Sequence, residues 1–340
     1  MQEDSGYEST FSSQGQCGSF SPLNVNSYTD PHLKAGYSDQ WNFGFQRELA
    51  PGAATINYVG SHNARISTNI TANAAPSPGP GDPQLRAPYP YILPMNYTKS
   101  IGTSDYNGLQ ISSQLKLHSG IISTLAYTWS KTLVTGCDGL FADCDIQDPY
   151  HLDRDRGPAA HDLTHIFSTS FVVPLPFGGG RRFNTSSSFV NHIIGNWQLN
   201  GIVSLTSGPR YDVQTDPSVA NTNNLYGTER VNLVGNPYAN GTKTSPLNVS
   251  AFVNPDPFTF GNMGRNSLRA DWNKNFDLSL FRSFSVTESK RFEFRAEAFN
   301  ATNTPVFAIP DANIQDPNFG VVSSTANTER QLQLGLKFYF

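Results

Sequence analysis

The chain has 340 residues and a formal net charge of -4, with 15% charged and 12% aromatic residues. Because the charge balance is slightly acidic and no basic cluster occurs, nucleic acid is not an expected partner. The mean hydropathy is -0.39, and no apolar run approaches the roughly 20 residues of a membrane-spanning helix. These features exclude a helical membrane protein but not a β-barrel, in which only every second residue of a strand faces lipid.

Nine segments alternate apolar and polar residues with the two-residue period of a β-strand that has one apolar face. They lie at 40–48, 53–61, 106–117, 121–131, 163–174, 196–206, 274–284, 290–300 and 331–340. Most are close to the about 9 to 11 residues that a tilted strand needs to cross a membrane. Residues 1–37 lack this pattern and are predicted to be an irregular loop segment, so the strand domain is assigned to 38–340.

The C-terminal segments show the alternation most clearly and predict the environment of individual side chains. The residues expected to face lipid are Leu278, Leu280, Phe292, Phe294, Leu332, Leu334 and Leu336. The residues expected to face the lumen are Asp277, Arg291, Glu293, Arg295 and Glu297. These charges are predicted to pair across strands with one another, which keeps the lumen face wet, and a catalytic acid/base set is the weaker alternative.

The links between the predicted segments alternate in length, as in outer-membrane barrels with short periplasmic turns and long external loops. The short links are 49–52, 118–120 and 285–289, and the long ones are 62–105, 132–161, 207–273 and 301–329. The exception is 175–195, a longer link on the predicted periplasmic side. The sequence therefore predicts an all-β, antiparallel, up-and-down transmembrane β-barrel, as a partial barrel of about nine to eleven strands. A soluble β-sandwich is the alternative.

The C-terminal strand ends on an aromatic residue without a polar tail. Gln333, Gly335, Phe338 and Phe340 resemble the C-terminal signal by which bacterial barrels are recognised for insertion into the outer membrane. This similarity predicts an outer-membrane location, with the membrane lipid and the barrel-assembly machinery as partners.

Few residues have the spacing of a catalytic or metal-binding motif. His161 and His165 have a spacing that suits a metal on a helix, but they lead into a predicted strand, so no metal site is assigned. The acidic group Asp138, Asp143, Asp145 and Asp148 does not have the spacing of a known calcium loop. The charges at 153–156 are predicted to be a solvated cluster at the barrel mouth. We expect no enzyme activity and no cofactor.

Two of the three cysteines are placed to form a disulfide. Cys137 and Cys144 lie in one predicted external loop, where oxidising conditions allow a disulfide. Two free thiols are the equal alternative, and Cys17 is left over near the N-terminus.

Eight segments resemble, in the same order, consecutive stretches of the Oar-like TonB-dependent receptors. They read WNFGFQREL at 41–49, YVGS at 58–61, YTWSK at 127–131, DRDRGP at 153–158, PLPFG at 174–178, NWQLNG at 196–201, FEFRAEAFN at 292–300 and NFG at 318–320. The resemblance implies a barrel of about 22 strands filled by a plug, which takes up a bulky nutrient with energy supplied by the TonB complex.

Only the C-terminal part of such a barrel has a counterpart here, without the plug, the N-terminal extension or a TonB-coupling motif. The chain is therefore expected to be a fragment that is not active alone. The alternative function is that of a secreted or surface all-β protein for adhesion or carbohydrate binding.

Overall fold

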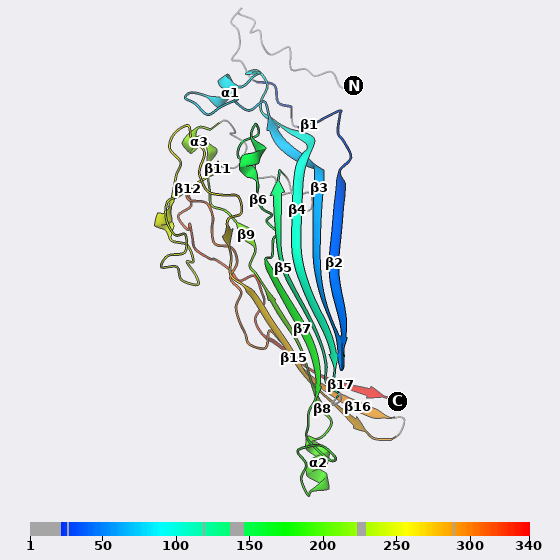
Figure 1. The fold of residues 1–340 in the computed structure, drawn as a ribbon. Helices are drawn as coiled ribbons and strands as arrows, with labels where there is room; N and C mark the ends of the chain where they lie inside the picture. The colour runs from blue at the N-terminus through cyan, green and yellow to red at the C-terminus, as the bar shows by residue number, and fades with distance from the viewer. Residues whose placement is uncertain (1–21, 26, 118–119, 137–145, 223–228, 288–289) are drawn as a thin grey trace, which may run out of the picture.

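The computed structural model describes residues 22–25, 27–117, 120–136, 146–222, 229–287 and 290–340. Among these residues, nine long antiparallel strands form one sheet, in which each strand lies beside its neighbours in the chain (Figure 1). They are β2 (Tyr37–Leu49), β3 (Gly52–Ala72), β4 (Met95–Lys116), β5 (Ile122–Thr135), β7 (His165–Pro174), β8 (Trp197–Thr206), β15 (Asn273–Ser285), β16 (Arg291–Phe299) and β17 (Gln331–Tyr339). The predicted all-β, up-and-down fold is confirmed, and each predicted segment coincides with one of these strands.

Two short strands bring the sheet to 11 strands. β1 (Ser27–Thr29), within the segment predicted to be irregular, runs parallel to β4, and β6 (Gly157–Pro158) pairs with β5. The link between β8 and β15 contains three further two-stranded ladders. These ladders pair β9 (Arg210–Tyr211) with β14 (Leu268–Arg269), β10 (Gln214–Thr215) with β11 (Glu229–Arg230), and β12 (Asn232–Leu233) with β13 (Phe252–Val253).

The helices of the described residues are short. They are α1 (Pro83–Arg86), α2 (Ser188–Ile194), α3 (Pro217–Ala220) and the 3₁₀ turns η2 (Leu152–Asp155) and η3 (Val249–Ala251). None of the described helices has the length and apolar character needed to cross a membrane.

The links are sorted by length between the two ends of the sheet. The turns after β2, β4 and β15 lie at the lower end in Figure 1, together with the C-terminus and the longer α2 link. The described parts of the links at 73–94, 136–164, 207–272 and 300–330, here called the external loops, lie toward the upper end. A single sheet with this sorting is not a sandwich of two packed sheets, so the sandwich alternative was wrong.

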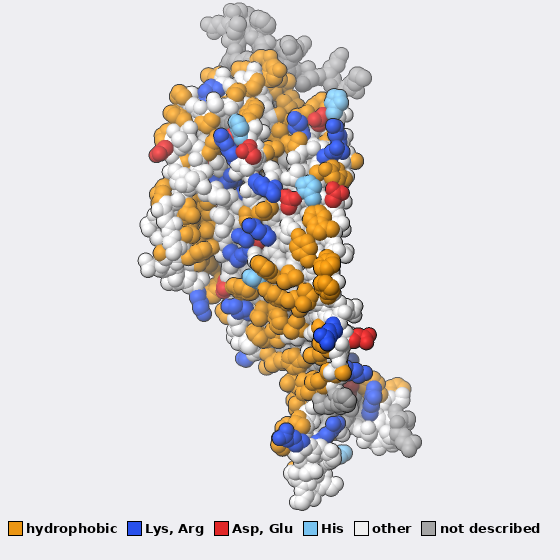
Figure 2. Space-filling model, in the orientation of Figure 1, with side chains coloured by type: hydrophobic (Ala, Val, Ile, Leu, Met, Phe, Trp, Pro, Cys, Tyr) orange, Lys and Arg blue, Asp and Glu red, His pale blue; other side chains and the backbone are white. Residues whose placement is uncertain are grey.

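The register gathers the apolar positions of all nine strands on one face of the sheet. Leu280 pairs with Ala296, which pairs with Leu334 on the next strand. Figure 2 shows hydrophobic side chains concentrated over the lower part of the long strands, below a level where charged side chains are frequent. On this face Leu334 is 74% exposed, although it belongs to a well-formed strand. An apolar surface of this kind requires an apolar environment.

The side chains predicted to face lipid and those predicted to face the lumen lie on opposite faces of this sheet. Glu297 pairs with Ser279 and Gln333, one position from the apolar row that contains Leu280 and Leu334. The structure thus separates the two predicted groups, and their contact with lipid and lumen remains a prediction.

β3 and β4 extend much further than expected, with 21 and 22 residues. Residues 62–72 and 95–105, predicted to be loop, are paired strand, with a register irregularity near Arg65. These extensions are rich in Ser, Thr and Asn and lack strict alternation. Because polar residues predominate on both faces of these extensions, the two-residue period that marks a strand with one apolar face is absent.

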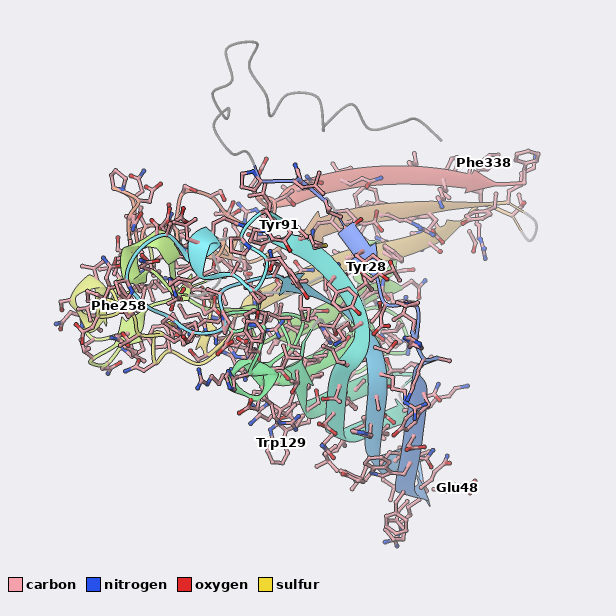
Figure 3. The ribbon with its side chains drawn as sticks, turned by 90° about the horizontal axis from the view of Figure 1, so that it is seen from above. Tyr28, Glu48, Tyr91, Trp129, Phe258 and Phe338 are labelled. Carbon is pink, nitrogen blue, oxygen red and sulfur yellow. The ribbon has the colours of Figure 1, made fainter. Side chains whose placement is uncertain are left out.

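The sheet is curved and open. Among the described strands, β2 pairs only with β3 and β17 pairs only with β16. Seen from above in Figure 3, Glu48 on β2 and Phe338 on β17 lie at widely separated ends of the arc, and Trp129 points away from the sheet. The described strands therefore form a partial barrel wall in which one edge of β2 and one edge of β17 have no strand partner.

The main hydrophobic core of the described residues lies in the external loops and not in the sheet. This loop core consists of Tyr211, Val213, Val231, Leu247, Ala251, Phe252, Met263 and Leu268. Phe319 of the last external loop packs edge-on against Phe252, with ring centroids 5.6 Å apart. The long loops are thus folded onto one another.

The two faces can be tested with one substitution on each, at the same level of the sheet. Leu334→Arg places a charge on the apolar face, which costs about 2 to 4 kcal/mol near the middle of a bilayer. The control Ser279→Arg places the same charge on the opposite face, beside Glu297. We expect a strong loss of assembled protein only for Leu334→Arg, measured as heat-modifiable migration of the protein in isolated outer membranes. Equal loss in both variants would contradict the assignment of the faces.

Candidate functional site

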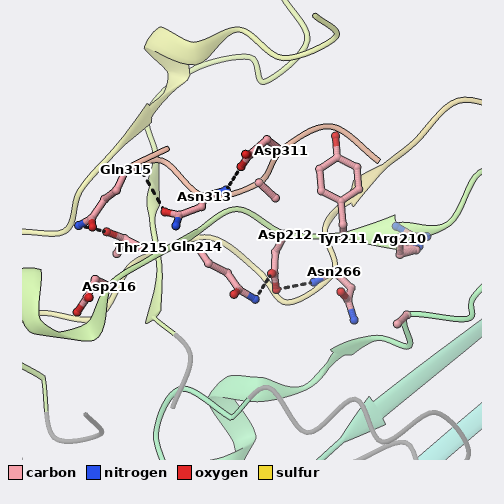
Figure 4. Close-up of a pocket in the computed structure, with 12 residues that line it drawn as sticks. Arg210, Tyr211, Asp212, Gln214, Thr215, Asp216, Asn266, Asp311, Asn313 and Gln315 are labelled. Atoms are coloured by element: carbon pink, nitrogen blue, oxygen red, sulfur yellow. Dashed lines mark hydrogen bonds between the residues drawn. The ribbon is translucent and has the colours of Figure 1, made fainter. Parts of the chain in front are cut away.

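The external loops line an open cavity of about 570 Å³, here called the polar cavity because most of its lining residues are polar (Figure 4). Its walls come from the segment after β8 and from the last external loop, which lie side by side because Gln214 and Asn313 form a β-bridge. The residues that line it are Ala160, Arg210, Tyr211, Asp212, Gln214, Thr215, Asp216, Asn266, Asp311, Ala312, Asn313 and Gln315. Carboxylate and amide groups predominate in this lining.

Hydrogen bonds within the wall hold several of these groups in place. Asp212 accepts hydrogen bonds from the Gln214 side chain at 3.1 Å and from the Asn266 amide at 3.2 Å. Gln315 donates to the Thr215 hydroxyl at 3.3 Å, which ties the last loop to the segment after β8. These bonds preorganise a surface of hydrogen-bonding groups, which lowers the entropic cost of binding a polar ligand.

The carboxylates give this cavity an acidic character. Asp216 accepts a hydrogen bond from the Ser218 amide at 2.8 Å, and hydrogen bonding to Ser218 lowers the pKa of its carboxyl group. The guanidinium group of Arg210 is engaged by Asp162 at 2.9 Å. The cavity suits an uncharged hydroxyl-rich ligand or a cationic one better than an anion.

Asp162 anchors the loops at the rim of the sheet. Its carboxylate, 1% exposed, accepts hydrogen bonds from the Thr132 amide at 2.8 Å, Arg210 Nε at 2.9 Å and Arg269 Nη2 at 3.0 Å. Burial alone would raise the pKa of Asp162, but the bonds from Thr132 and the two arginines hold it below its ordinary value. Removing this carboxylate would leave two partly buried cations together, so the cluster fixes the loops that form the cavity.

A second ionic cluster lies inside the loops. Asp155, 0% exposed, forms an ion pair with Arg230 at 2.8 Å. Arg230 also donates to the Met263 carbonyl at 3.0 Å, next to the loop core. The prediction that residues 153–156 form a solvated cluster was therefore wrong for Asp155, because its buried partner is distant in the sequence.

Glu229 is the strongly perturbed acid of this cluster. Its side chain is 1% exposed and accepts a hydrogen bond from the Gly261 amide at 3.0 Å. Burial raises its pKa to about 7, and the nearby Asp155 acts in the same direction. This carboxyl group titrates near neutral pH and couples the loop packing to pH.

The predicted lumen-face charges pair differently from expectation. Arg295 contacts Glu293 on its own strand, with 2.5 Å between the charged groups, and lies over the ring of Phe281. Asp277 accepts hydrogen bonds from Asn275 and from the Asn300 amide, and not from an arginine of β16. The ion pair expected across strands is thus formed within one strand.

The other sequence candidates do not converge on a site. His165 opens β7 and stacks between Tyr127 and Trp272, with ring centroids 6.2 Å and 5.7 Å away. Asp148 is paired with Arg154 at 2.9 Å. No group of three or more potential metal ligands occurs among the described residues. The possible disulfide between Cys137 and Cys144, the other acidic residues of that loop and Cys17 lie outside the described residues.

Sequence reasoning did not identify the cavity. The only signal was composition, because the segments around 210–216 and 311–316 are rich in Asp, Asn and Gln. Their approach depends on one bridge between loops that are far apart in the chain.

A single antiparallel sheet with one apolar face, short turns at one end and folded loops at the other defines a section of an outer-membrane β-barrel wall. The family described as outer membrane beta barrel domain matches residues 3–333. The chain belongs to this family, and its location is the bacterial outer membrane.

Solved structures show a similar architecture at low identity. The chain is similar to the outer membrane transporter YddB from Escherichia coli, with a TM-score of 0.48 and 9% identity over 94% of this chain and 34% of that one. It is also similar to BauA, the ferric preacinetobactin receptor from Acinetobacter baumannii, with a TM-score of 0.43 and 10% identity over 89% of this chain and 29% of that one. The chain thus spans about a third of the length of each. No match was found among curated protein sequences.

The titration of Glu229 predicts a pH-dependent loop core. Because its folded pKa is about 7 and its ordinary value is 4.5, the protonated form favours folding. That contribution is fully present below the ordinary value and is lost as pH rises through the folded value. Protease cleavage of the external loops should therefore accelerate between about pH 5 and 8, measured on protein in outer membranes. Glu229→Gln should flatten this profile relative to the native chain, and an unchanged profile would contradict the assignment.

Proposed function

We propose that this chain is the C-terminal wall section of an Oar-like TonB-dependent receptor that takes up a bulky nutrient. The remaining strands and the plug belong to another part of the receptor. The observation that carries the proposal is the open sheet, since β2 and β17 each leave one edge unpaired among the described strands. In lipid, each unpaired backbone group costs several kcal/mol, so such edges need further strands.

The wall section has a passive role in this proposal. The face with Leu280 and Leu334 contacts lipid, and the face with Arg295 and Glu297 meets the plug in the intact receptor. The C-terminal residues Gln333, Gly335, Phe338 and Phe340 guide insertion by the barrel-assembly machinery. Energy reaches the receptor through the TonB complex only when the plug is present, so the section alone is inactive in uptake.

The polar cavity of the external loops is the proposed contact for the nutrient before it enters the lumen. Its position at the predicted external end and its fixed hydrogen-bonding groups support this role. The same cavity supports the second candidate, a surface protein that binds carbohydrate without transporting it, because hydroxyl-rich ligands match carboxylate and amide groups. Catalysis has no part in either proposal.

The DNA in frame upstream of the Met1 codon tests the receptor proposal. We expect an open extension that encodes a plug, additional alternating strands and a secretion signal. A stop codon close to Met1 in that frame would contradict the proposal of an energy-driven receptor, because nothing would then complete the wall or provide a plug.

A further inference from the structure

The link between β7 and β8 is the long exception among the turns at the lower end, and it carries the helix α2. Successive residues of a helix are rotated by about 100°, which places Phe189, Val190, Ile193 and Ile194 on one side. Ser188, Asn191 and His192 fall on the other side. The helix is therefore amphipathic despite its length of 7 residues.

The polar side of α2 is used within the link itself. Asn191 accepts a hydrogen bond from the Thr185 amide at 2.8 Å and donates to the Thr185 carbonyl at 2.6 Å. The apolar side has no comparable cover, since Phe189 is 74% and Ile193 48% exposed. The link thus satisfies its polar groups and presents its apolar ones outward.

Arg282 of β15 holds the helix against the sheet. Its position is in phase with Leu278 and Leu280, so it lies on the apolar face, and it is 4% exposed. Its guanidinium group donates to the carbonyls of His192 and Ile193 at the end of α2. These carbonyls have no partner within a helix and carry partial negative charge, so a cation is well placed there.

The contacts of Arg282 with the end of α2, here called the clamp, also connect the helix to the apolar face. The guanidinium group of Arg282 lies over Trp197, 5.4 Å from the ring centroid, and over Phe284 at 4.0 Å. The indole nitrogen of Trp197 donates to the Ile193 carbonyl at 3.2 Å, and its ring meets Phe294 edge-on with centroids 6.2 Å apart. Phe294 is one of the residues predicted to face lipid. The end of α2 is therefore attached to the same face of the sheet as Phe294.

Aromatic residues at the lower end of the sheet mark the level of the interface. Phe292 and Phe338 pack together with centroids 4.7 Å apart, on the same face as Trp197. Aromatic side chains form such belts at both borders of a transmembrane barrel. α2 lies beyond the lower ends of the strands in Figure 1. Because the end of the helix is bonded to Trp197 on the aromatic face, we place α2 at the border where such belts meet the lipid headgroups.

We propose that α2 is an interfacial anchor that inserts Phe189, Val190 and Ile193 into the periplasmic leaflet and binds glycerophospholipid there. Arg282 is the positioning residue, which holds the helix at the correct depth. Arg181 and Arg182, both exposed in the same link, are placed to meet the lipid phosphate groups. This inference depends on the outer-membrane location and not on nutrient uptake. Amphipathic helices bind membranes in this way, with the apolar side about 5–10 Å deep.

Photocrosslinking in isolated outer membranes tests the proposal. One variant carries Phe189→p-benzoylphenylalanine, and the matched control carries His192→p-benzoylphenylalanine, on the polar side of the same helix. After irradiation, we expect a phospholipid adduct, detected by mass spectrometry, at position 189 and none at position 192. An adduct with a protein at position 189, no adduct, or equal lipid adducts at both positions would each overturn the proposal.

Arg282→Met tests the clamp in the variant labelled at position 189. Methionine is tolerated on an apolar face, so the barrel section should still assemble, checked by heat-modifiable migration. We expect loss of the lipid adduct, because the helix ends are no longer held. An unchanged adduct in assembled protein would overturn the positioning role of Arg282. Whether α2 inserts into lipid is decided separately, by the comparison of positions 189 and 192.

Discussion

Backbone hydrogen bonding in a medium without water is the constraint on which this structure depends. Lipid offers no partner to peptide groups, so each strand must find its partners in adjacent strands. Antiparallel pairing of strands that are neighbours in the chain meets this requirement with short turns at one end. Among the described strands, one edge of β2 and one edge of β17 do not meet this requirement.

Outside the part of the sheet with an apolar face, charged side chains hold the loops in position. Asp162 joins the ends of β5 to the loops that carry Arg210 and Arg269, and Asp155 with Arg230 fixes the interior of the loops. Asp162 holds Arg210 at the edge of the polar cavity, and the bridge between Gln214 and Asn313 joins the two main walls of that cavity. Arg282 has a similar role at the opposite end of the sheet, where its guanidinium group donates hydrogen bonds to the last carbonyls of α2. Each buried charge thus fixes a segment that the sheet alone does not order.

The sequence predicted the strands wherever one face had to be apolar. β16 and β17 alternate strictly, and β15 does so from Phe276 to Leu280, so that apolar residues gather on one face of the sheet and polar ones on the other. The extensions of β3 and β4 were missed because polar residues predominate on both of their faces and leave no two-residue period. The burial of Asp155 and the cavity around Asp212 were missed because they depend on contacts between distant loops. Arg282 did leave a signal, an arginine in the apolar phase of a strand, and the unusual length of the α2 link was a second one.

The central claim is that the even-numbered residues of β17 face lipid and the odd-numbered ones do not. A spin label placed at each position from 331 to 339, in protein assembled in a bilayer, measures this directly through its collisions with oxygen and with a water-soluble nickel complex. The account predicts a two-residue period, with oxygen collisions highest at Leu332, Leu334, Leu336 and Phe338 and nickel collisions highest at the residues between them. Absence of the period, or the opposite phase, would contradict it.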